Sequence, residues 1–336
     1  MKIGVVGCGA LGSYYGAKLG RAGREVHLLL RSDYEAVRRN GVQVRSVEGD
    51  FHVQPKCARA AAEIGVCDLV LIGLKTTANH QFPRLLPPLV GAKTAVMTLQ
   101  NGLGNEAQMA ALFGPEKILG GLCFVCLNRV EPGVIHHLAH GTIVMGEHQR
   151  WPEPRTHELA SMFRHAGVPC KVTDNLERAH WEKLVWNIPF NGLGVASAAG
   201  YDAVASGGVV RPSVAPRPCL PTDRLLADLR WERLVRELML EVIAAANALG
   251  LRISESVADK QIEQTRTMGA YQASTLIDFE RGQPLELESM FLEPLLQARK
   301  AGVAAPRLAA LCEVLTALDP GQRASHAKSG QFNIPG

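Results

Sequence analysis

Short apolar runs alternate with longer amphipathic stretches over the first half of the chain. The first run covers 2–6 and leads into three glycines within six positions, a helix-like segment and a second apolar run over 26–30. Further strand-like runs, separated by helical or polar stretches, follow at 69–74, 95–99, 118–125 and 142–145. Strands that alternate with helices predict a mostly parallel sheet with helices on both of its faces.

From residue 174 onward the pattern changes, because long helical segments follow one another with little strand signal. Helical periodicity covers four stretches, 175–198, 222–249, 255–281 and 284–300. Asp174 and Glu177 have the spacing of a capping box, with Asp in the Ser/Thr role, so the first of these helices is predicted to begin there.

These patterns predict two domains and a tail, as the length of 336 residues also suggests. We expect an α/β Rossmann domain over 1–173, followed by an all-helical second domain over 174–318. The polar tail, 319–336, is expected to be disordered. From Ser206 to Pro221 two glycines and four prolines predict an exposed loop, since such a segment sustains neither a helix nor a central strand.

The composition is that of a soluble globular protein, with 47% hydrophobic and 20% charged residues. The formal net charge of +4 is too small to predict a nucleic-acid surface, and it suits a small anionic molecule equally well. No apolar run reaches the roughly 18 residues that a membrane span requires. The eight cysteines lie mostly in apolar segments without a preceding secretion signal, so we expect reduced thiols and a cytoplasmic protein.

Neither group of potential metal ligands predicts a metal site. Cys123 and Cys126 have the spacing of half a zinc or redox site, but no second pair accompanies them. His136, His137 and His140 lie where glycines favour strand and turn, so their side chains are not expected to converge as they would on a helix. The sequence also lacks a nucleophile elbow and a Walker lysine motif, which argues against a hydrolase or a phosphotransferase.

A glycine turn after the first strand predicts a dinucleotide-binding site. Gly7, Gly9 and Gly12 put residues without side chains at the tight turn, at the approach to the pyrophosphate and at the helix-to-strand contact. The phosphates would bind at the start of the following helix, beside Ala10 and Leu11, where unpaired N–H groups and the helix dipole favour negative charge. A glycine-rich turn without a ligand is the alternative, and the strand, helix and second strand around the motif argue against it.

The end of the second strand bears on the choice of dinucleotide. Enzymes that use NAD usually place an acid there to bind the ribose 2′-hydroxyl, and this chain has Arg31. A guanidinium offers forked donors to a 2′-phosphate, so the sequence favours NADPH. Asp33 lies two residues further on and leaves NAD open as the alternative.

Two further strand ends supply candidate site residues. Lys75 follows the run 69–74, and Asn101 follows the run 95–99. Ligands of open parallel sheets bind beyond the carboxyl ends of the strands, so both positions are predicted to border the cofactor. A solvated lysine at a strand end is an equally good reading of Lys75 by position alone.

Polar residues recur along the first helix of the second domain. Lys183, Asn187 and Asn191 follow one another at four-residue spacing and fall within an arc of about 80°. Their neighbours are apolar, so the ammonium and the two amides need partners or a cleft. A wet helix face is the alternative, and Pro189 is predicted to kink the helix near this arc.

Glu286 lies near the start of another predicted helix. Pro284 has the place of a first helical residue, which would put Glu286 in the first turn, where a carboxylate interacts favourably with the helix dipole. Capping alone would explain this residue, and a catalytic role is the alternative.

Taken together, these motifs resemble the ketopantoate reductase (2-dehydropantoate 2-reductase) family over nearly the whole chain, to about residue 318. The matching positions are the glycine turn with Arg31, Leu74-Lys75, 100–104 (QNGLG), 181–184 (WEKL) with Asn187 and Asn191, Ser274, Glu286, and 301–303 (AGV) with Pro306. The lysine helix together with the Asn-Gly strand end is more specific than the glycine turn.

The resemblance implies an oxidoreductase that reduces 2-dehydropantoate to pantoate with NADPH for coenzyme A biosynthesis. It implies that Lys183 is the general acid and that Glu286 orients the lysine or the substrate hydroxyl. It also implies substrate contacts from Asn187, Asn191, Ser274 and Asn101, cofactor contacts from Lys75 and Asn101, and a homodimer.

Three departures from the family pattern keep alternatives open. Pro189 precedes Asn191, where the family usually has Pro after the second asparagine. The run 285–288 reads LELE where the family has a Thr-Glu-Ile-Asp type run, and the segment 206–221 looks inserted. A reductase of another small 2-oxo acid, or a dinucleotide sensor without turnover, therefore stands beside the main prediction.

Overall fold

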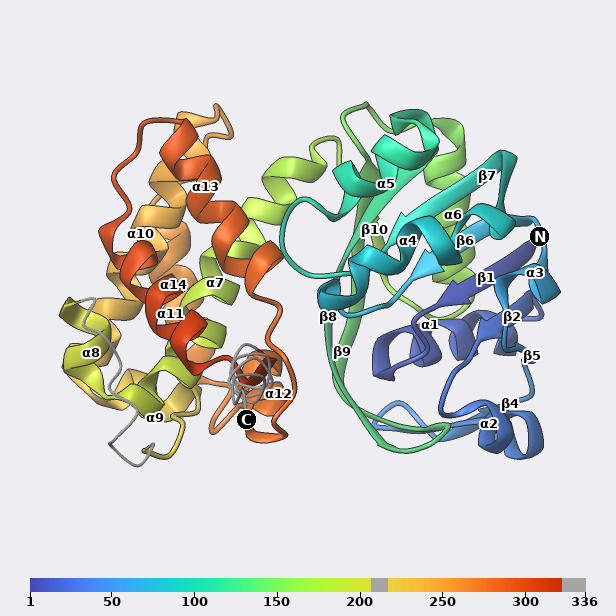
Figure 1. The fold of residues 1–336 in the computed structure, drawn as a ribbon, viewed down its shortest axis with the longest axis horizontal. Coiled ribbons are helices and arrows are strands. Elements are labelled where there is room, and N and C mark those ends of the chain that lie inside the picture. The colour runs from blue at the N-terminus through green and yellow to red at the C-terminus, as the bar shows by residue number, and fades with distance from the viewer. Residues whose placement is uncertain (207–216, 322–336) are drawn as a thin grey trace, which may run out of the picture. The chain divides into compact units, whose positions relative to one another are not determined.

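The computed structural model describes residues 1–206 and 217–321, which form two compact units, Met1–Ala179 and His180–Gly336 (Figure 1). The first unit is an α/β domain and the second is helical, as the sequence predicts. No helix in the described residues combines the length and the apolar character needed to cross a bilayer.

A single twisted sheet forms the centre of the first unit, with the strand order β4-β3-β9-β8-β7-β6-β1-β2-β5 and with β10 paired to β9. Among the described residues all pairings are parallel except β3 with β4 and β8 with β9. The strands are β1 (Lys2–Val6), β2 (Glu25–Leu29), β3 (Val42–Ser46), β4 (Phe51–Val53), β5 (Lys56–Ala58), β6 (Cys67–Ile72), β7 (Val90–Thr98), β8 (Ile118–Glu131), β9 (Val134–Glu147) and β10 (Cys170–Val172).

An apolar core covers each face of this sheet. Successive side chains of a strand point to opposite faces, and on β6 both sets are buried. Leu69 and Leu71 of β6 belong to one apolar core, while Val70 and Ile72 belong to a second core on the other face. The helical segments of the unit are α1 (Ala10–Arg21), α2 (Tyr34–Asn40), α3 (Ala61–Ile64), η1 (Thr76–Gln81), α4 (Phe82–Leu85), η2 (Pro87–Leu89), α5 (Asn105–Phe113), η3 (Pro115–Lys117) and α6 (Pro154–His165).

The strands extend beyond the predicted runs at one side of the sheet. The run predicted over 118–125 belongs to β8 and the run over 142–145 belongs to β9, and these two 14-residue strands form a long antiparallel hairpin. The outer part of β9 pairs with β3, and the strands β3, β4 and β5 were not predicted from the sequence. The hairpin was missed because its outer residues are largely exposed or polar, so they lack a continuous apolar pattern.

The second unit contains only helical elements in its described residues. They are the larger part of α7 (Leu176–Ala196), η4 (Ser197–Ala199), α8 (Tyr201–Ser206), α9 (Thr222–Ala227), α10 (Leu229–Ala248), α11 (Ser256–Arg266), α12 (Ser274–Glu280), the π-helical turn η5 (Glu288–Leu292), α13 (Glu293–Lys300) and α14 (Pro306–Leu318). The predicted stretches 222–249 and 255–281 are each two helices, broken at Asp228 and over 267–273.

Helix α7 is the buried centre of this unit. From Trp181 to Ala198 almost every residue is buried, as expected for a helix that is apolar on all sides. A Cβ atom at Gly192 would lie 2.6 Å from Leu311 Cδ2 and 3.0 Å from Phe291 Cε1, so α14 and η5 approach α7 as closely as a glycine allows.

Two predicted helix starts are wrong. Asn175 rather than Asp174 caps α7, because the Asn175 Oδ1 accepts a 2.8 Å hydrogen bond from the backbone N–H of Arg178. The helix predicted from Pro284 begins only at Leu287, which leaves Glu286 just before it. The backbone N–H of Leu285 donates to Asp319 Oδ1 at 3.0 Å, and this tertiary hydrogen bond holds the segment before the helix.

The two segments predicted as loop and tail lie partly outside the described residues. These are residues 207–216 of the segment 206–221 and residues 322–336 of the tail. Asp319 was predicted to belong to a disordered tail. It is buried, and its carboxylate accepts the hydrogen bond from the backbone N–H of Leu285.

Candidate active site

Four neighbouring parallel strands end at one level, and the predicted cofactor residues follow them. Val6 of β1 pairs with Leu29 of β2 and with Ile72 of β6, and Ile72 pairs with Thr98 of β7. Gly7, Arg31, Lys75 and Asn101 come within three residues after these ends. The structure therefore brings the predicted cofactor residues of the first unit to the carboxyl edge of its sheet.

The glycine turn has the geometry that its spacing predicts. Gly7 has a φ of +94°, and a Cβ there would lie 2.2 Å from the backbone N of Leu74. A Cβ at Gly12 would lie 2.3 Å from the carbonyl O of Gly7. Both positions therefore require glycine, because any side chain would clash with backbone atoms.

Gly9 differs from the other two glycines because a Cβ there would meet nothing within 4 Å. It is the N-cap of α1, whose first turn contains no acidic residue. The chain thus presents an open, side-chain-free helix N-terminus, where N–H groups and the helix dipole favour an anion. These residues fit the pyrophosphate of a dinucleotide.

Two charged residues after the carboxyl end of β2 differ in their exposure to solvent. Arg31 is exposed, whereas Asp33 is buried with an exposed fraction of 4%. Both oxygens of the Asp33 carboxylate accept hydrogen bonds from Nη1 of Arg129, at 2.6 and 2.7 Å, and Oδ1 also accepts one from Ser32 Oγ at 2.8 Å. At this strand end Arg31 is therefore the side chain that is open to a ligand, and Asp33 is not.

A chain of amide hydrogen bonds holds the loop that carries Asn101. Gln100 Nε2 donates to Asn79 Oδ1 at 2.8 Å, and Asn79 Nδ2 donates to Asn105 Oδ1 at 2.9 Å. Asn105 Nδ2 in turn donates to the backbone carbonyl of Asn101 at 3.0 Å. Asn105 is fully buried, so the start of α5 fixes the backbone at Asn101.

Lys75 lies at the same edge, and its side chain is exposed. Strand β6 ends at Ile72 rather than at Leu74, and Lys75 is the N-cap of η1. Its position beyond the strand end is therefore as predicted, although the strand is two residues shorter.

The second unit carries the other predicted site residues. Lys183, Asn187 and Asn191 occupy successive turns of α7, which continues through Pro189. The side chain of Lys183 is half-buried, whereas Asn187 and Asn191 are buried with exposed fractions of 6% and 3%. The alternative of a wet helix face therefore does not apply to the two asparagines.

Asn191 and Ser274 are brought together by the packing of α12 on α7. The Oδ1 of Asn191 accepts hydrogen bonds from Ser274 Oγ at 3.3 Å and from the backbone N–H of Thr275 at 3.1 Å. Asn191 thus satisfies a free N–H group at the start of α12. Glu286 is buried with an exposed fraction of 6%, and it precedes the π-helical turn η5, a rare element that often occurs at functional sites.

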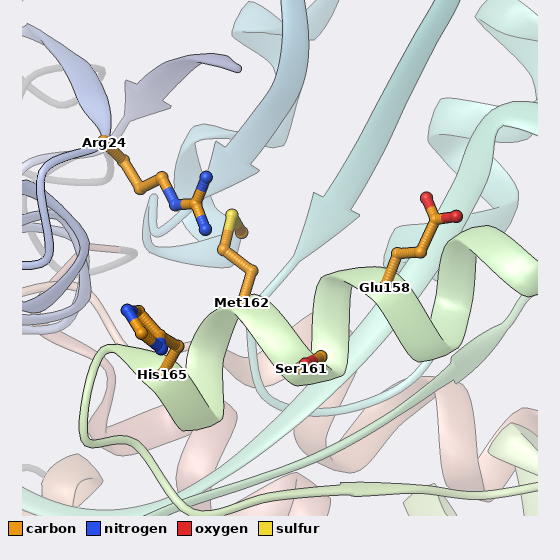
Figure 2. Close-up of a pocket in the computed structure, with 5 residues that line it drawn as sticks. All are labelled: Arg24, Glu158, Ser161, Met162 and His165. Atoms are coloured by element: carbon orange, nitrogen blue, oxygen red, sulfur yellow. The ribbon is translucent and has the colours of Figure 1, made fainter.

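The cavity in Figure 2 lies at the other edge of the first unit. Its volume is about 330 Å³, and its lining residues are Arg24, Glu158, Ser161, Met162 and His165. Arg24 directly precedes β2, which is parallel to β1, so this cavity lies at the amino ends of the strands, away from the glycine turn. None of the predicted site residues lines it.

Among the histidines noted in the sequence, His137 has protein partners at both of its ring nitrogens. His137 is buried, with Ser46 Oγ 2.8 Å from its Nδ1 and the carbonyl O of His140 2.8 Å from its Nε2. In the described residues no three His, Cys, Asp or Glu side chains are placed to hold a metal ion.

Comparison with known proteins extends the likeness to the whole chain. Residues 3–150 match the family model described as ketopantoate reductase PanE/ApbA, and residues 219–319 match its C-terminal model. The 2-dehydropantoate 2-reductase of Nostoc sp. is 39% identical over 99% of this chain and 98% of the relative. The chain belongs to the ketopantoate reductase family.

Solved structures agree with this membership of the ketopantoate reductase family. The crystal structure of 2-dehydropantoate 2-reductase from Geobacter metallireducens is 47% identical, with a TM-score of 0.86, and covers 94% of this chain and 99% of that chain. A ternary structure of D-mandelate dehydrogenase with NADH and anilino(oxo)acetate has a TM-score of 0.82 at 19% identity, covering 96% of this chain and 99% of that chain. At that identity it shows a shared fold only. Membership of the ketopantoate reductase family makes the chain a dinucleotide-binding oxidoreductase.

Reasoning from the sequence missed two groups around this site. Asn105 follows Asn101 by four residues at a helix start, so its spacing was a usable signal. Arg129 had no local signal, because it is 96 residues away from Asp33 along the chain.

Proposed function

We propose that this protein reduces 2-dehydropantoate to pantoate with NADPH in pantothenate and coenzyme A biosynthesis. The observation that carries the proposal is full-length membership of the ketopantoate reductase family, with relatives of 39% and 47% identity named 2-dehydropantoate 2-reductase. The exposed Arg31 and the pairing of the Asp33 carboxylate with Arg129 support NADPH as the cofactor.

Gly7, Gly9, Gly12 and Arg31 would hold the dinucleotide, which would supply the hydride for reduction of the substrate's carbonyl carbon. Lys183 donates a proton to the carbonyl oxygen, where negative charge develops as the bond to hydrogen forms. Asn187, Asn191 and Ser274 bind polar groups of the substrate, and the buried Glu286 orients its hydroxyl group or Lys183. Lys75 and Asn101 contact the cofactor and the substrate at the carboxyl edge of the sheet.

The test is NADPH oxidation with a panel of 2-oxo acids. Trimethylpyruvate is the matched control, because it keeps the branched carbon skeleton of 2-dehydropantoate and lacks only its hydroxyl group. We expect kcat/KM for 2-dehydropantoate to exceed that for trimethylpyruvate by at least about 10²-fold, since a site built to bind a hydroxyl group rejects the analogue without it. A higher kcat/KM for another acid of the panel, such as phenylglyoxylate, would identify a different reductase. Binding of NADPH without oxidation by any acid would identify a sensor.

The proposal includes a cytoplasmic homodimer. The eight cysteines lie mostly in apolar segments, which suits reduced thiols in a reducing compartment. Light scattering of the purified protein would give the mass, and the expected value is twice the 36.3 kDa of one chain.

A further inference from the structure

Asp33 lies two residues past the place, held here by Arg31, at which an enzyme that uses NAD normally has an acid, and it is not presented to a ligand. It follows the end of β2 as the N-cap of α2, and its side chain makes no capping hydrogen bond there. The side chain is only 6% exposed. An acid at this place normally binds the ribose 2′-hydroxyl and repels a 2′-phosphate.

Arg129 engages this carboxylate from a distant part of the chain. It lies on the outer part of β8, 96 residues beyond Asp33, and its Nη1 is 2.6 and 2.7 Å from the two carboxylate oxygens. Ser32 Oγ adds a third hydrogen bond to the same carboxylate. Three of the roughly four acceptor sites of the carboxylate are therefore used, and with the side chain only 6% exposed the fourth is hardly accessible to a ribose.

The pair also changes the local charge. A buried carboxylate needs a cation close by, and Arg129 supplies it. The Arg129 side chain is 43% exposed, so Arg31 and Arg129 both contribute positive charge at the end of β2, where the Asp33 carboxylate is paired. Such a surface attracts a 2′-phosphate.

We propose that Arg129 is a specificity-determining residue for the cofactor. By pairing with Asp33 it removes the acceptor that NAD requires and cancels the negative charge that would repel the 2′-phosphate of NADPH. This inference deepens the proposed function and rests on it.

The test measures binding of adenosine fragments by calorimetry, without turnover. 2′,5′-ADP carries the 2′-phosphate and 5′-AMP lacks it. In Arg129→Ala, Asp33 is uncovered, and we expect the Kd of 2′,5′-ADP to rise about tenfold or more, with the Kd of 5′-AMP changed less than about twofold.

A second variant separates a selective role from a structural one. In Arg129→Ala/Asp33→Asn the neutral amide repels no phosphate, so the affinity for 2′,5′-ADP should return to within about threefold of the unaltered protein. If Arg129 merely held the outer part of β8 against the start of α2, the double variant would bind 2′,5′-ADP as weakly as the single one, and the inference would be overturned. Lys56→Ala is the matched control, because it breaks an exposed 2.7 Å ion pair with Glu25 at the amino end of β2. It should leave the Kd of both fragments unchanged.

The outcome for the unaltered protein distinguishes the two proposals. If it binds 2′,5′-ADP and 5′-AMP equally well, the preference for NADPH fails, and this inference fails with it. If it prefers 2′,5′-ADP and Arg129→Ala keeps that preference, only the role of Arg129 is wrong.

Discussion

Lys183 is a charged side chain on a helix whose neighbouring residues are largely apolar and buried. Trp181, Leu184 and Val185 are almost fully buried, while Lys183 keeps partial contact with solvent. The sequence could indicate this position, because three polar residues at four-residue spacing stand out in an apolar segment. It could not indicate that Asn191 binds the start of α12, since that partner is 84 residues away.

Replacing Lys183 tests its proposed role as the general acid. We expect Lys183→Ala to lower kcat by about 10²-fold or more, because the carbonyl oxygen loses its proton donor, and to leave NADPH affinity nearly unchanged. Steady-state kinetics gives kcat, and a fluorescence titration gives the affinity. Added ethylamine should restore part of kcat, which would not occur if the lysine were only structural. The exposed Lys260 offers the control Lys260→Ala, and a variant at position 183 with normal kcat would remove that lysine from the mechanism.

At the scale of elements, the sequence predicts what local pattern determines. The glycine turn, the parallel strands before it and after it, and helix α7 were all predictable, because apolar periodicity and glycine spacing report directly on backbone geometry. The start at Leu287 and the outer part of the β8–β9 hairpin were not. The hydrogen bond from Leu285 to Asp319 and the pairing of β9 with β3 depend on residues far away in sequence.

The loop between β7 and α5 gives a prediction at this scale. Asn105→Ala removes the hydrogen bond to the Asn101 carbonyl and leaves the Asn79 amide without its acceptor. We expect a loss of about 1–3 kcal/mol in the free energy of unfolding, together with a fall in kcat/KM of about tenfold or more as Asn101 shifts. Urea denaturation and steady-state kinetics measure the two effects.

A control on the same strand separates stability from positioning. Thr94 lies at the middle of β7, seven residues before Asn101; it is buried, and its Oγ1 donates to the carbonyl of Cys67 at 2.6 Å. Thr94→Val should cost a similar free energy of unfolding and leave kcat/KM within about twofold. Equal losses of kcat/KM in both variants would mean that the amide chain contributes only to stability.

At the scale of the whole molecule, the division into two units falls within α7, after Ala179. A Cβ at Gly120 would lie 2.7 Å from Leu176 Cδ2, so the first turn of α7 packs on the hairpin strand β8. The later turns form the centre of the helical unit. A capping residue in the sequence indicates where a helix begins. The limit of a compact unit depends instead on which apolar core each turn of the helix packs against.

Two buried thiols allow the opening of each unit to be followed separately. Burial raises the pKa of Cys170 on β10 and that of Cys312 on α14 to about 12. Because the thiolate is the reactive form, a raised pKa suppresses alkylation of the folded protein at mildly alkaline pH. In the unfolded chain the thiol pKa falls back to about 8.5, so labelling reports transient opening.

We expect a ligand of the first unit to protect Cys170 more than Cys312. If 2′,5′-ADP binds only the closed first unit, a concentration of about 100 times its Kd should slow labelling of Cys170 by about 100-fold. Cys312 belongs to the core of the second unit, and its labelling should slow by less than about tenfold. Mass spectrometry of peptides after timed alkylation measures both rates in one sample. Equal slowing of the two thiols would show that the units open together, and unchanged labelling of Cys170 would show that the fragment does not bind the unit that carries the glycine turn.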